Sequence, residues 1–160
     1  MSVCSVRLSG IFGRWEWLTS ARDTPSPHFQ VMQRALRGEP ALFARRDRRD
    51  WTYATDVANA VDIVIDAAKL SHRLYNLSGN AVVSAFEWGQ RLAEIRSGFE
   101  CRLTENGEAP TIDLYGPEDR QPMDVTRLLS DTDYVAQFDT RRSVEDYDAW
   151  TRINEWAFSE

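Results

Sequence analysis

Cysteine, histidine and lysine are scarce in this sequence, which contains two cysteines, two histidines and a single lysine. Cys4 and Cys101 lie far apart in the chain and do not form the framework of paired cysteines found in small secreted domains. His28 and His72 have no cysteine or carboxylate at the spacing of metal ligands, so a zinc site is not expected. A reducing, cytoplasmic setting is the simplest interpretation of this composition.

Long apolar runs and an excess of basic charge are also lacking. The stretch richest in apolar residues, 57–68, is interrupted by Asn59, Asp62 and Asp66, so it cannot span a membrane. No basic segment followed by an apolar run opens the chain, and we therefore expect no signal peptide. The 19 basic and 25 acidic residues give a net charge of -6, which argues against nucleic acid as a partner because phosphate polymers are repelled.

What the sequence does contain is enough apolar material for one folded domain, since 42% of its 160 residues are hydrophobic. Short strands alternate with helices, which predicts an α/β fold. Strands are expected at 3–12, 41–44, 51–53 and 74–77. Helices are expected at 27–37, 55–70, 84–96 and 124–129, and from Ser143 through Ala157. The segments 14–25 and 104–124 are expected to be loops.

Capping residues mark the predicted helix starts. They are Ser26 with Pro27 at the first helical position, Thr55 or Asp56, Ser84 with Glu87 in a capping box, Asp124, and Ser143 with Asp146. Gly38 is expected to end the first helix in a left-handed conformation. The helix at 55–70 carries its polar residues in one stripe, which predicts burial on most sides. Trp88, Trp150 and Trp156 occupy core-like helical positions.

Four motifs occur in an order that carries a family resemblance. They are Arg-Leu-Ser-Gly-Ile-Phe-Gly at 7–13, Arg-Asp-Trp-Thr-Tyr-Ala-Thr-Asp-Val-Ala at 49–58, Tyr-Asn-Leu-Ser-Gly at 75–79, and Asp-Val-Thr-Arg-Leu at 124–128 followed by Ser-Val-Glu-Asp at 143–146. Each motif is weak alone, but the series resembles the NAD(P)-dependent epimerase/dehydratase family of extended short-chain dehydrogenases/reductases, which act on nucleotide sugars.

The resemblance covers nearly all of this chain but only the latter half of the family's usual length. It implies an α/β fold corresponding to the C-terminal, substrate-binding portion of such a protein, without the N-terminal Rossmann half. On this interpretation residues 1–13 are a residual strand of the parental Rossmann sheet, and residues 14–160 are the substrate-binding domain. The strand at 3–12 is then expected to have lost its neighbours.

The sequence departs from the family at the residues that bind cofactor and perform chemistry. The family uses a glycine-rich turn for NAD or NADP and a Tyr-x-x-x-Lys pair, together with a serine or threonine, for catalysis. No glycines here have the dinucleotide-binding spacing, and the only lysine, Lys69, has no tyrosine four residues before it. We therefore expect no catalytic residues and no cofactor bound by this chain alone, whereas the complete family implies NAD or NADP.

The resemblance also implies a set of substrate-binding residues. Arg49 corresponds to the family arginine that contacts the nucleotide diphosphate, and Arg120 is the candidate for a second arginine from the late loop. Ser9, Gly10 and Phe12 lie in the strand-end motif, where Gly10 replaces the usual asparagine. Apart from the resemblance, residues 45–50 read equally well as a solvated turn with internal Arg–Asp pairs. By the same residue-level reasoning, Asp56 is a helix cap and Asn76 a turn residue.

Three functions stay open at this point. The chain is an incomplete epimerase/dehydratase that binds a nucleotide sugar and needs a Rossmann-domain partner, or it is a non-enzymatic binding or self-associating module derived from that family. In either case the N-terminal strand could mediate pairing with the partner or with a second copy. The third function is a small enzyme of unrelated mechanism, although no convergent set of catalytic side chains is visible.

Overall fold

The computed structural model describes residues 3–18 and 24–158. The strands are β1 (Ser5–Leu8), β2 (Gly10–Phe12), β3 (Ala41–Phe43), β4 (Trp51–Tyr53), β5 (Leu74–Leu77) and β6 (Cys101–Leu103). The helices are α1 (Pro27–Arg37), α2 (Ala54–Asp66), α3 (Ala85–Ile95), α4 (Thr126–Asp131) and α5 (Thr140–Ile153), followed by the 3-10 helix η1 (Glu155–Phe158). The predicted α/β architecture of short strands and helices is therefore confirmed.

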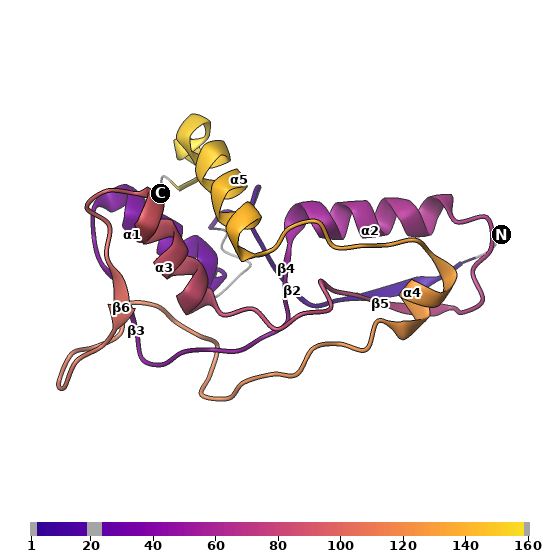
Figure 1. Ribbon diagram of the computed structural model, residues 1–160, viewed down its shortest axis with the longest axis horizontal. Helices are drawn as coiled ribbons and strands as arrows, with labels where there is room; N and C mark the ends of the chain where they lie inside the picture. The colour runs from indigo at the N-terminus through magenta and orange to yellow at the C-terminus, as the bar shows by residue number, and fades with distance from the viewer. Residues whose placement is uncertain (1–2, 19–23, 159–160) are drawn as a thin grey trace.

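The molecule is elongated, and its strands form three separate parallel pairs (Figure 1). β1 pairs with β5 at the end that holds α2 and α4, whereas β3 pairs with β6 at the end that holds α1 and α3. β2 pairs with β4 between these two ends. The strand β6 was not expected from the sequence, whereas β3, β4 and β5 lie where strands were predicted.

The single strand predicted at 3–12 is wrong, because the chain breaks into β1 and β2 at Ser9. The Ser9 backbone N–H donates to the carbonyl of Leu77 at 3.2 Å, and the next N–H, of Gly10, donates to the carbonyl of Asp50 at 3.2 Å. The hydrogen-bond ladder thus changes partner between two consecutive residues. The segment leaves one sheet and enters another without an intervening loop.

We also predicted that the strand at 3–12 has lost its neighbouring strands, and this prediction is wrong for one of its two edges. Ser5 pairs with Leu74 and Gly10 with Trp51, so both strands find partners in later parts of the chain. Within the described residues, no strand pairs with the other edge of β1. All four β1 residues are exposed, including the apolar Val6 at 38%. One edge of the segment therefore remains open.

Two helix starts and one helix end follow the predicted capping chemistry. The Ser26 hydroxyl accepts from the Phe29 N–H at 3.1 Å, and the Ser84 hydroxyl accepts from the Glu87 N–H at 3.2 Å. Gly38 ends α1 with a φ of 67°, in the left-handed region that glycine adopts at no steric cost.

Two other predicted caps are wrong because their side chains bind distant partners. Asp56 lies inside α2, where its carboxylate accepts from the backbone N–H groups of Gln137 and Phe138 at 2.8 and 3.0 Å. Ser143 lies inside α5 and accepts from the Trp88 indole N–H at 3.1 Å. Helix α5 instead starts after Asp139, whose side chain accepts from the Arg142 N–H. The predicted turn around Asp124 is found slightly later, with the Asp124 carboxylate accepting from the Thr126 N–H at 2.9 Å.

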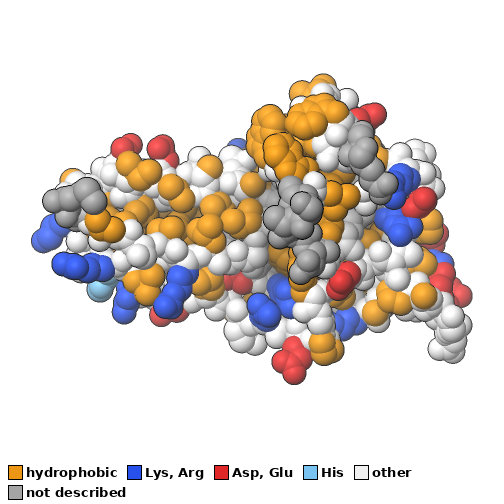
Figure 2. Space-filling view, turned by 180° about the vertical axis from the view of Figure 1, so that it is seen from behind, with side chains coloured by type: hydrophobic (Ala, Val, Ile, Leu, Met, Phe, Trp, Pro, Cys, Tyr) orange, Lys and Arg blue, Asp and Glu red, His pale blue; other side chains and the backbone are white. Residues whose placement is uncertain are grey.

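The prediction that helix 55–70 is buried on most sides is wrong. Helix α2 ends at Asp66, and only Asp56, Ala60 and Val64 among its residues are buried. Ile65 is 73% exposed, so the apolar surface of α2 is only partly covered. Figure 2 shows hydrophobic side chains reaching the surface along this end of the molecule. Within the described residues, no helix combines the length and apolar character needed to cross a bilayer.

The buried side chains form two clusters. The larger cluster joins α1, α3 and α5 to β2, β3 and β4, and the smaller one joins α2 to β5 and α4. Trp88 and Trp150 are buried as predicted, at 0% and 7% exposure. Trp156 is 54% exposed, contrary to prediction, because the neighbouring Ala157 and Phe158 occupy the buried positions of η1. The larger cluster forms the floor beneath the cavity described next.

Candidate functional site

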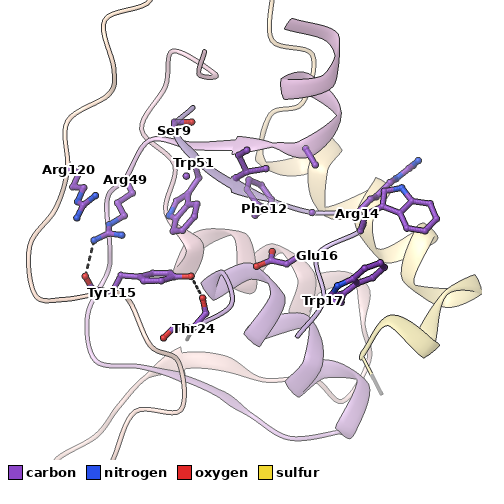
Figure 3. A pocket seen from close by; sticks show the side chains of 15 residues that line it. Ser9, Phe12, Arg14, Glu16, Trp17, Thr24, Arg49, Trp51, Tyr115 and Arg120 are labelled. Atoms are coloured by element: carbon purple, nitrogen blue, oxygen red, sulfur yellow. Dashed lines mark hydrogen bonds between the residues drawn. The ribbon is translucent and has the colours of Figure 1, made fainter. Parts of the chain in front are cut away.

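All five residues predicted to contact substrate line one cavity of about 1100 Å³ (Figure 3). Ser9, Gly10 and Phe12 come from the chain around β2, Arg49 lies two residues before the start of β4, and Arg120 comes from the long loop 104–124. The remaining lining comes from residues 13–17, from Ile11, Thr24, Trp51 and Tyr115, and from the start of α2. A smaller cavity of about 380 Å³ shares Ser9, Gly10, Arg49, Trp51 and Arg120 with it.

Backbone pairing holds the two arginines next to each other. Arg49 exchanges backbone hydrogen bonds with Val83 in an isolated bridge, and the Arg120 N–H donates to the Arg48 carbonyl at 3.0 Å. The Arg49 guanidinium donates to the Tyr115 carbonyl at 3.1 Å and lies 5.7 Å from the centre of the Tyr115 ring. The late loop therefore returns to the residues just before β4.

Neither Arg49 nor Arg120 forms an ion pair with a carboxylate in the described part of the chain. The Nε atom of Arg49 is buried and has no hydrogen-bond acceptor there. Burial and then the positive charge of Arg120 lower the pKa of Arg49, and the charge of Asp47 acts in the opposite direction. A guanidinium still stays protonated at neutral pH. The cavity wall thus carries two positive charges that an anion would stabilise.

The neighbouring acidic residues are already engaged. Asp119 pairs with Arg45, so the carboxylate next to Arg120 in sequence is directed to another cation. Asp47 and Asp50 are 2% and 7% exposed, which contradicts the interpretation of residues 45–50 as a solvated turn. Their carboxylates accept from backbone N–H groups, Asp47 from Phe86 at 3.2 Å and Asp50 from Met123 at 2.7 Å. These bonds fasten the turn that carries Arg49.

Gly10, where the family resemblance implies an asparagine, has no room for a side chain. Gly10 and Trp51 face each other in the β2–β4 register, and a Cβ atom on Gly10 would lie 2.6 Å from the Trp51 ring. Trp51 is 5% exposed, and its indole N–H has no acceptor among the described residues. The indole therefore occupies the space that an asparagine side chain would need.

The floor of the cavity is aromatic. Phe12 stacks on His28 with ring centres 3.7 Å apart. His28 is fully buried, and neither ring nitrogen has a hydrogen-bond partner within residues 3–18 and 24–158. Burial lowers its pKa well below the usual value. The Ser9 hydroxyl is 2.6 Å from that of Thr52, which also accepts from the Gly79 N–H. Ser9 thus lies at the cavity wall with its hydroxyl already hydrogen-bonded.

Sequence reasoning missed several residues that shape the cavity. Trp15 and Trp17 line it from the segment after β2, and Tyr115 lines it from the long loop. Glu16 also lines it, but its carboxylate accepts from the backbone N–H and the hydroxyl of Ser26, both at 2.6 Å. Arg14 pairs with Asp146 on α5. The sequence offered only a run of aromatic residues after Gly13 as a signal for this wall.

Among the residues that the structure describes, the cavity lining contains Tyr115 and no lysine. Lys69 follows α2 and lines a different cavity, together with His72 and Arg73. Burial and a hydrogen bond to Asp146 raise the pKa of Tyr53, and burial raises the pKa of Tyr147. Both phenols therefore hold their protons more tightly than a free tyrosine does. No three or more histidine, cysteine or carboxylate residues in the described ranges are grouped so that they could hold a metal ion.

Comparison with known proteins agrees with this picture. The model of the NAD dependent epimerase/dehydratase family matches residues 1–78, which carry β1 to β5 and the motifs at 7–13 and 49–58. The family resemblance found in the sequence is thereby confirmed. No curated protein sequence matches the chain significantly.

Several solved structures share the fold of this chain. Similar structures include the ADP-L-glycero-D-manno-heptose-6-epimerase of Helicobacter pylori, at 19% identity and a TM-score of 0.68 over 92% of this chain and 43% of that one. The dTDP-glucose 4,6-dehydratase of Bacillus anthracis in complex with NAD is 18% identical, with a TM-score of 0.65 over 94% and 45% of the two chains. The L-threonine 3-dehydrogenase of Trypanosoma brucei is 19% identical, with a TM-score of 0.69 over 94% and 46%.

At these identities the similarity defines the fold alone. The chain spans less than half the length of each of these three structures. It therefore carries one portion of an epimerase/dehydratase fold, and the activity of the complete proteins belongs to the proposals below.

Proposed function

We propose that this chain is the substrate-binding part of an NAD(P)-dependent epimerase/dehydratase and holds the diphosphate of a nucleotide sugar in the cavity between β2, β4 and the loop 104–124. The family match and the shared fold support the class of protein. Two of the similar enzymes are named for nucleotide-linked sugars, one with ADP and one with dTDP. The third is a threonine dehydrogenase, so the fold by itself does not fix the substrate.

The observation that carries the proposal is the pair of guanidinium groups at the cavity wall. Arg49 and Arg120 approach each other from segments far apart in sequence, and neither has a carboxylate partner among the described residues. Guanidinium groups bind phosphate oxygens through parallel N–H donors, and such charge-assisted bonds are stronger than neutral ones. A diphosphate has the charge and the oxygen atoms to satisfy both groups.

The cofactor and the reacting groups of such an enzyme are assigned to a dinucleotide-binding partner. Burial raises the pKa values of Tyr53 and Tyr147, and Lys69 lies at another cavity. On the proposed function, the chain binds and orients the substrate, while NAD or NADP on the partner supplies the redox chemistry. The isolated chain is then inactive. Tight stoichiometric binding of NADH or NADPH by the isolated chain would overturn this division of roles.

Calorimetric titration of the full chain with inorganic pyrophosphate tests the anion site. We expect Arg49→Gln to weaken binding by about tenfold or more, since a hydrogen bond to a charged group contributes roughly 1.5–3 kcal/mol. Arg48→Gln is the matched control, because Arg48 is exposed in the same turn and does not line the cavity. Equal affinities for the wild-type chain and Arg49→Gln would contradict the proposal.

The open edge of β1 favours a second candidate, a module that associates through this strand. An unpaired edge presents backbone groups to which another strand can add, and all four β1 residues are exposed. On the first proposal the strand that adds to β1 belongs to a dinucleotide-binding partner. On the second proposal it belongs to another copy of this chain. Sedimentation analysis separates them, because self-association predicts a dimer that Val6→Lys converts to a monomer. A monomer at high protein concentration would exclude the second candidate.

A further inference from the structure

Trp51 carries a hydrogen-bond donor that no acceptor in the described part of the chain satisfies. Its side chain is 5% exposed, and its indole N–H is buried without a partner there. By contrast, the buried Trp88 donates its indole N–H to the Ser143 hydroxyl at 3.1 Å. Buried donors in folded proteins are as a rule paired, because an unpaired one costs free energy. The N–H of Trp51 is therefore available to an acceptor that a ligand brings.

The unpaired donor lies at the same cavity as the two arginines. Trp51 lines both the cavity of about 1100 Å³ and the smaller one beside it, together with Arg49 and Arg120. Arg49 pairs in a β-bridge and Trp51 opens β4, so these alternate residues project from the same side of the chain. Figure 3 shows the Trp51 ring beside Arg49. Since the buried Nε of Arg49 also has no acceptor among the described residues, two unpaired N–H groups occur together.

The Trp51 ring also occupies the place where the family resemblance implies a different donor. That resemblance implies an asparagine at position 10, and Gly10 and Trp51 are partners in the β2–β4 register. A Cβ atom on Gly10 would lie 2.6 Å from the Trp51 ring, so the two side chains exclude each other. The absence of an amide donor on β2 and the presence of an indole donor on β4 therefore affect the same part of the cavity wall.

We propose that the indole N–H of Trp51 donates to a phosphate oxygen of the ligand, in place of the asparagine that position 10 lacks. This inference rests on the proposed function, because it uses the same anion site. A hydrogen bond to a charged oxygen is stronger than one to a neutral acceptor. An indole has one N–H and no acceptor, whereas an amide side chain has both. The exchange therefore favours an ionised phosphate, which only accepts, over ligand hydroxyl groups that need to donate.

Calorimetric titration of the full-length Trp51→Phe variant with inorganic pyrophosphate tests this assignment. The substitution removes the N–H and keeps an aromatic ring, and we expect binding to be about tenfold weaker than in the wild-type chain. Trp88→Phe is the matched control, because Trp88 is buried away from the cavity and its N–H is paired with Ser143. Both variants lose part of a buried ring and hence stability, but only Trp51→Phe should lose affinity for pyrophosphate.

Nuclear magnetic resonance of the indole N–H groups gives a readout that a merely structural role would not change. The Trp51 signal is assigned by its absence from the spectrum of Trp51→Phe, and the Trp88 signal by its absence from that of Trp88→Phe. On saturation with pyrophosphate, the Trp51 proton should shift downfield as it enters a charge-assisted hydrogen bond. The Trp88 proton, which already has an acceptor, should keep its position.

The outcomes separate this inference from the proposed function. Pyrophosphate binding that depends on Arg49 but is unchanged in Trp51→Phe would overturn the role of Trp51 and leave the anion site standing. An equal loss of affinity in Trp51→Phe and Trp88→Phe, or a Trp51 signal that pyrophosphate does not shift, would also overturn it. An absence of pyrophosphate binding, or binding that is independent of Arg49, would refute the proposed function and this inference together.

Discussion

The contact between Gly10 and Trp51 allows a quantitative test of how β2 and β4 form the cavity. A methyl group added at Gly10 would lie 2.6 and 2.7 Å from two carbons of the Trp51 ring, closer than carbon atoms approach in folded proteins. The ring is 5% exposed and packed within the main cluster, so it has little room to move. Gly10→Ala therefore forces a displacement of the indole or of β2.

The expected cost follows from two opposing effects. Overpacking a well-packed site costs about 1–3 kcal/mol, whereas replacing glycine by alanine stabilises by about 0.4–1 kcal/mol through the unfolded chain. Gly10 does not have a positive φ, so the backbone itself tolerates alanine. The net destabilisation is about 1–2 kcal/mol, which lowers Tm by roughly 2–8 °C for a protein of this size.

Thermal melts and urea titrations measure this effect, with Gly79→Ala as the control. A Cβ on Gly79 would have its nearest contact 3.8 Å away, at the Thr52 hydroxyl, so no clash is expected there. In the double variant Gly10→Ala/Trp51→Leu, the two costs should fall short of additivity, because the smaller side chain removes the clash. Unchanged stability of Gly10→Ala, or strict additivity in the double variant, would refute the steric explanation.

Three further predictions concern the supports of the cavity. Because burial lowers the pKa of His28 in the folded state, the unfolded state takes up the proton first, and stability should fall as the pH drops below about 6.5. In the His28→Leu variant, the urea midpoint should depend less on pH in this range. An unchanged pH dependence of the urea midpoint would contradict this explanation. Asp56→Ala should cost about 2–4 kcal/mol and speed amide exchange at Gln137 and Phe138, whose N–H groups lose their acceptor, whereas the exposed Asp62→Ala should do neither. Ser84→Ala should cost about 1 kcal/mol in chemical unfolding through loss of the α3 cap, and no loss would show that the cap is dispensable.

The features that could be predicted from the sequence are those set by nearby residues. The starts of α1 and α3 depend on Ser26 and Ser84, whose hydroxyls bond within three residues. Asp56 and Ser143 look equally suited to capping, but their partners come from segments 81 and 55 residues away. The break at Ser9 likewise depends on two partner strands that no local pattern identifies.

The candidate site divides in the same way. Arg49 and Arg120 were identified through the order of the family motifs, and the structure places both at one cavity. The aromatic side of the cavity was missed, because it exists only where residues 13–17 pack against α5 and η1. The steric restriction at Gly10 could not be predicted either, because it comes from the ring of Trp51 on another strand.

The exchange of partners at Ser9 has a consequence for the order of folding. β2 and β4 must meet across a long intervening segment that includes α1 and β3, which carries the larger entropic cost of loop closure. Once they have paired, β1 is tethered beside β4, and only the segment containing α2 separates β4 from β5. The β1–β5 ladder then closes as a local event. From these loop lengths we expect the β2–β4 pair at the cavity wall to form before the β1–β5 ladder closes.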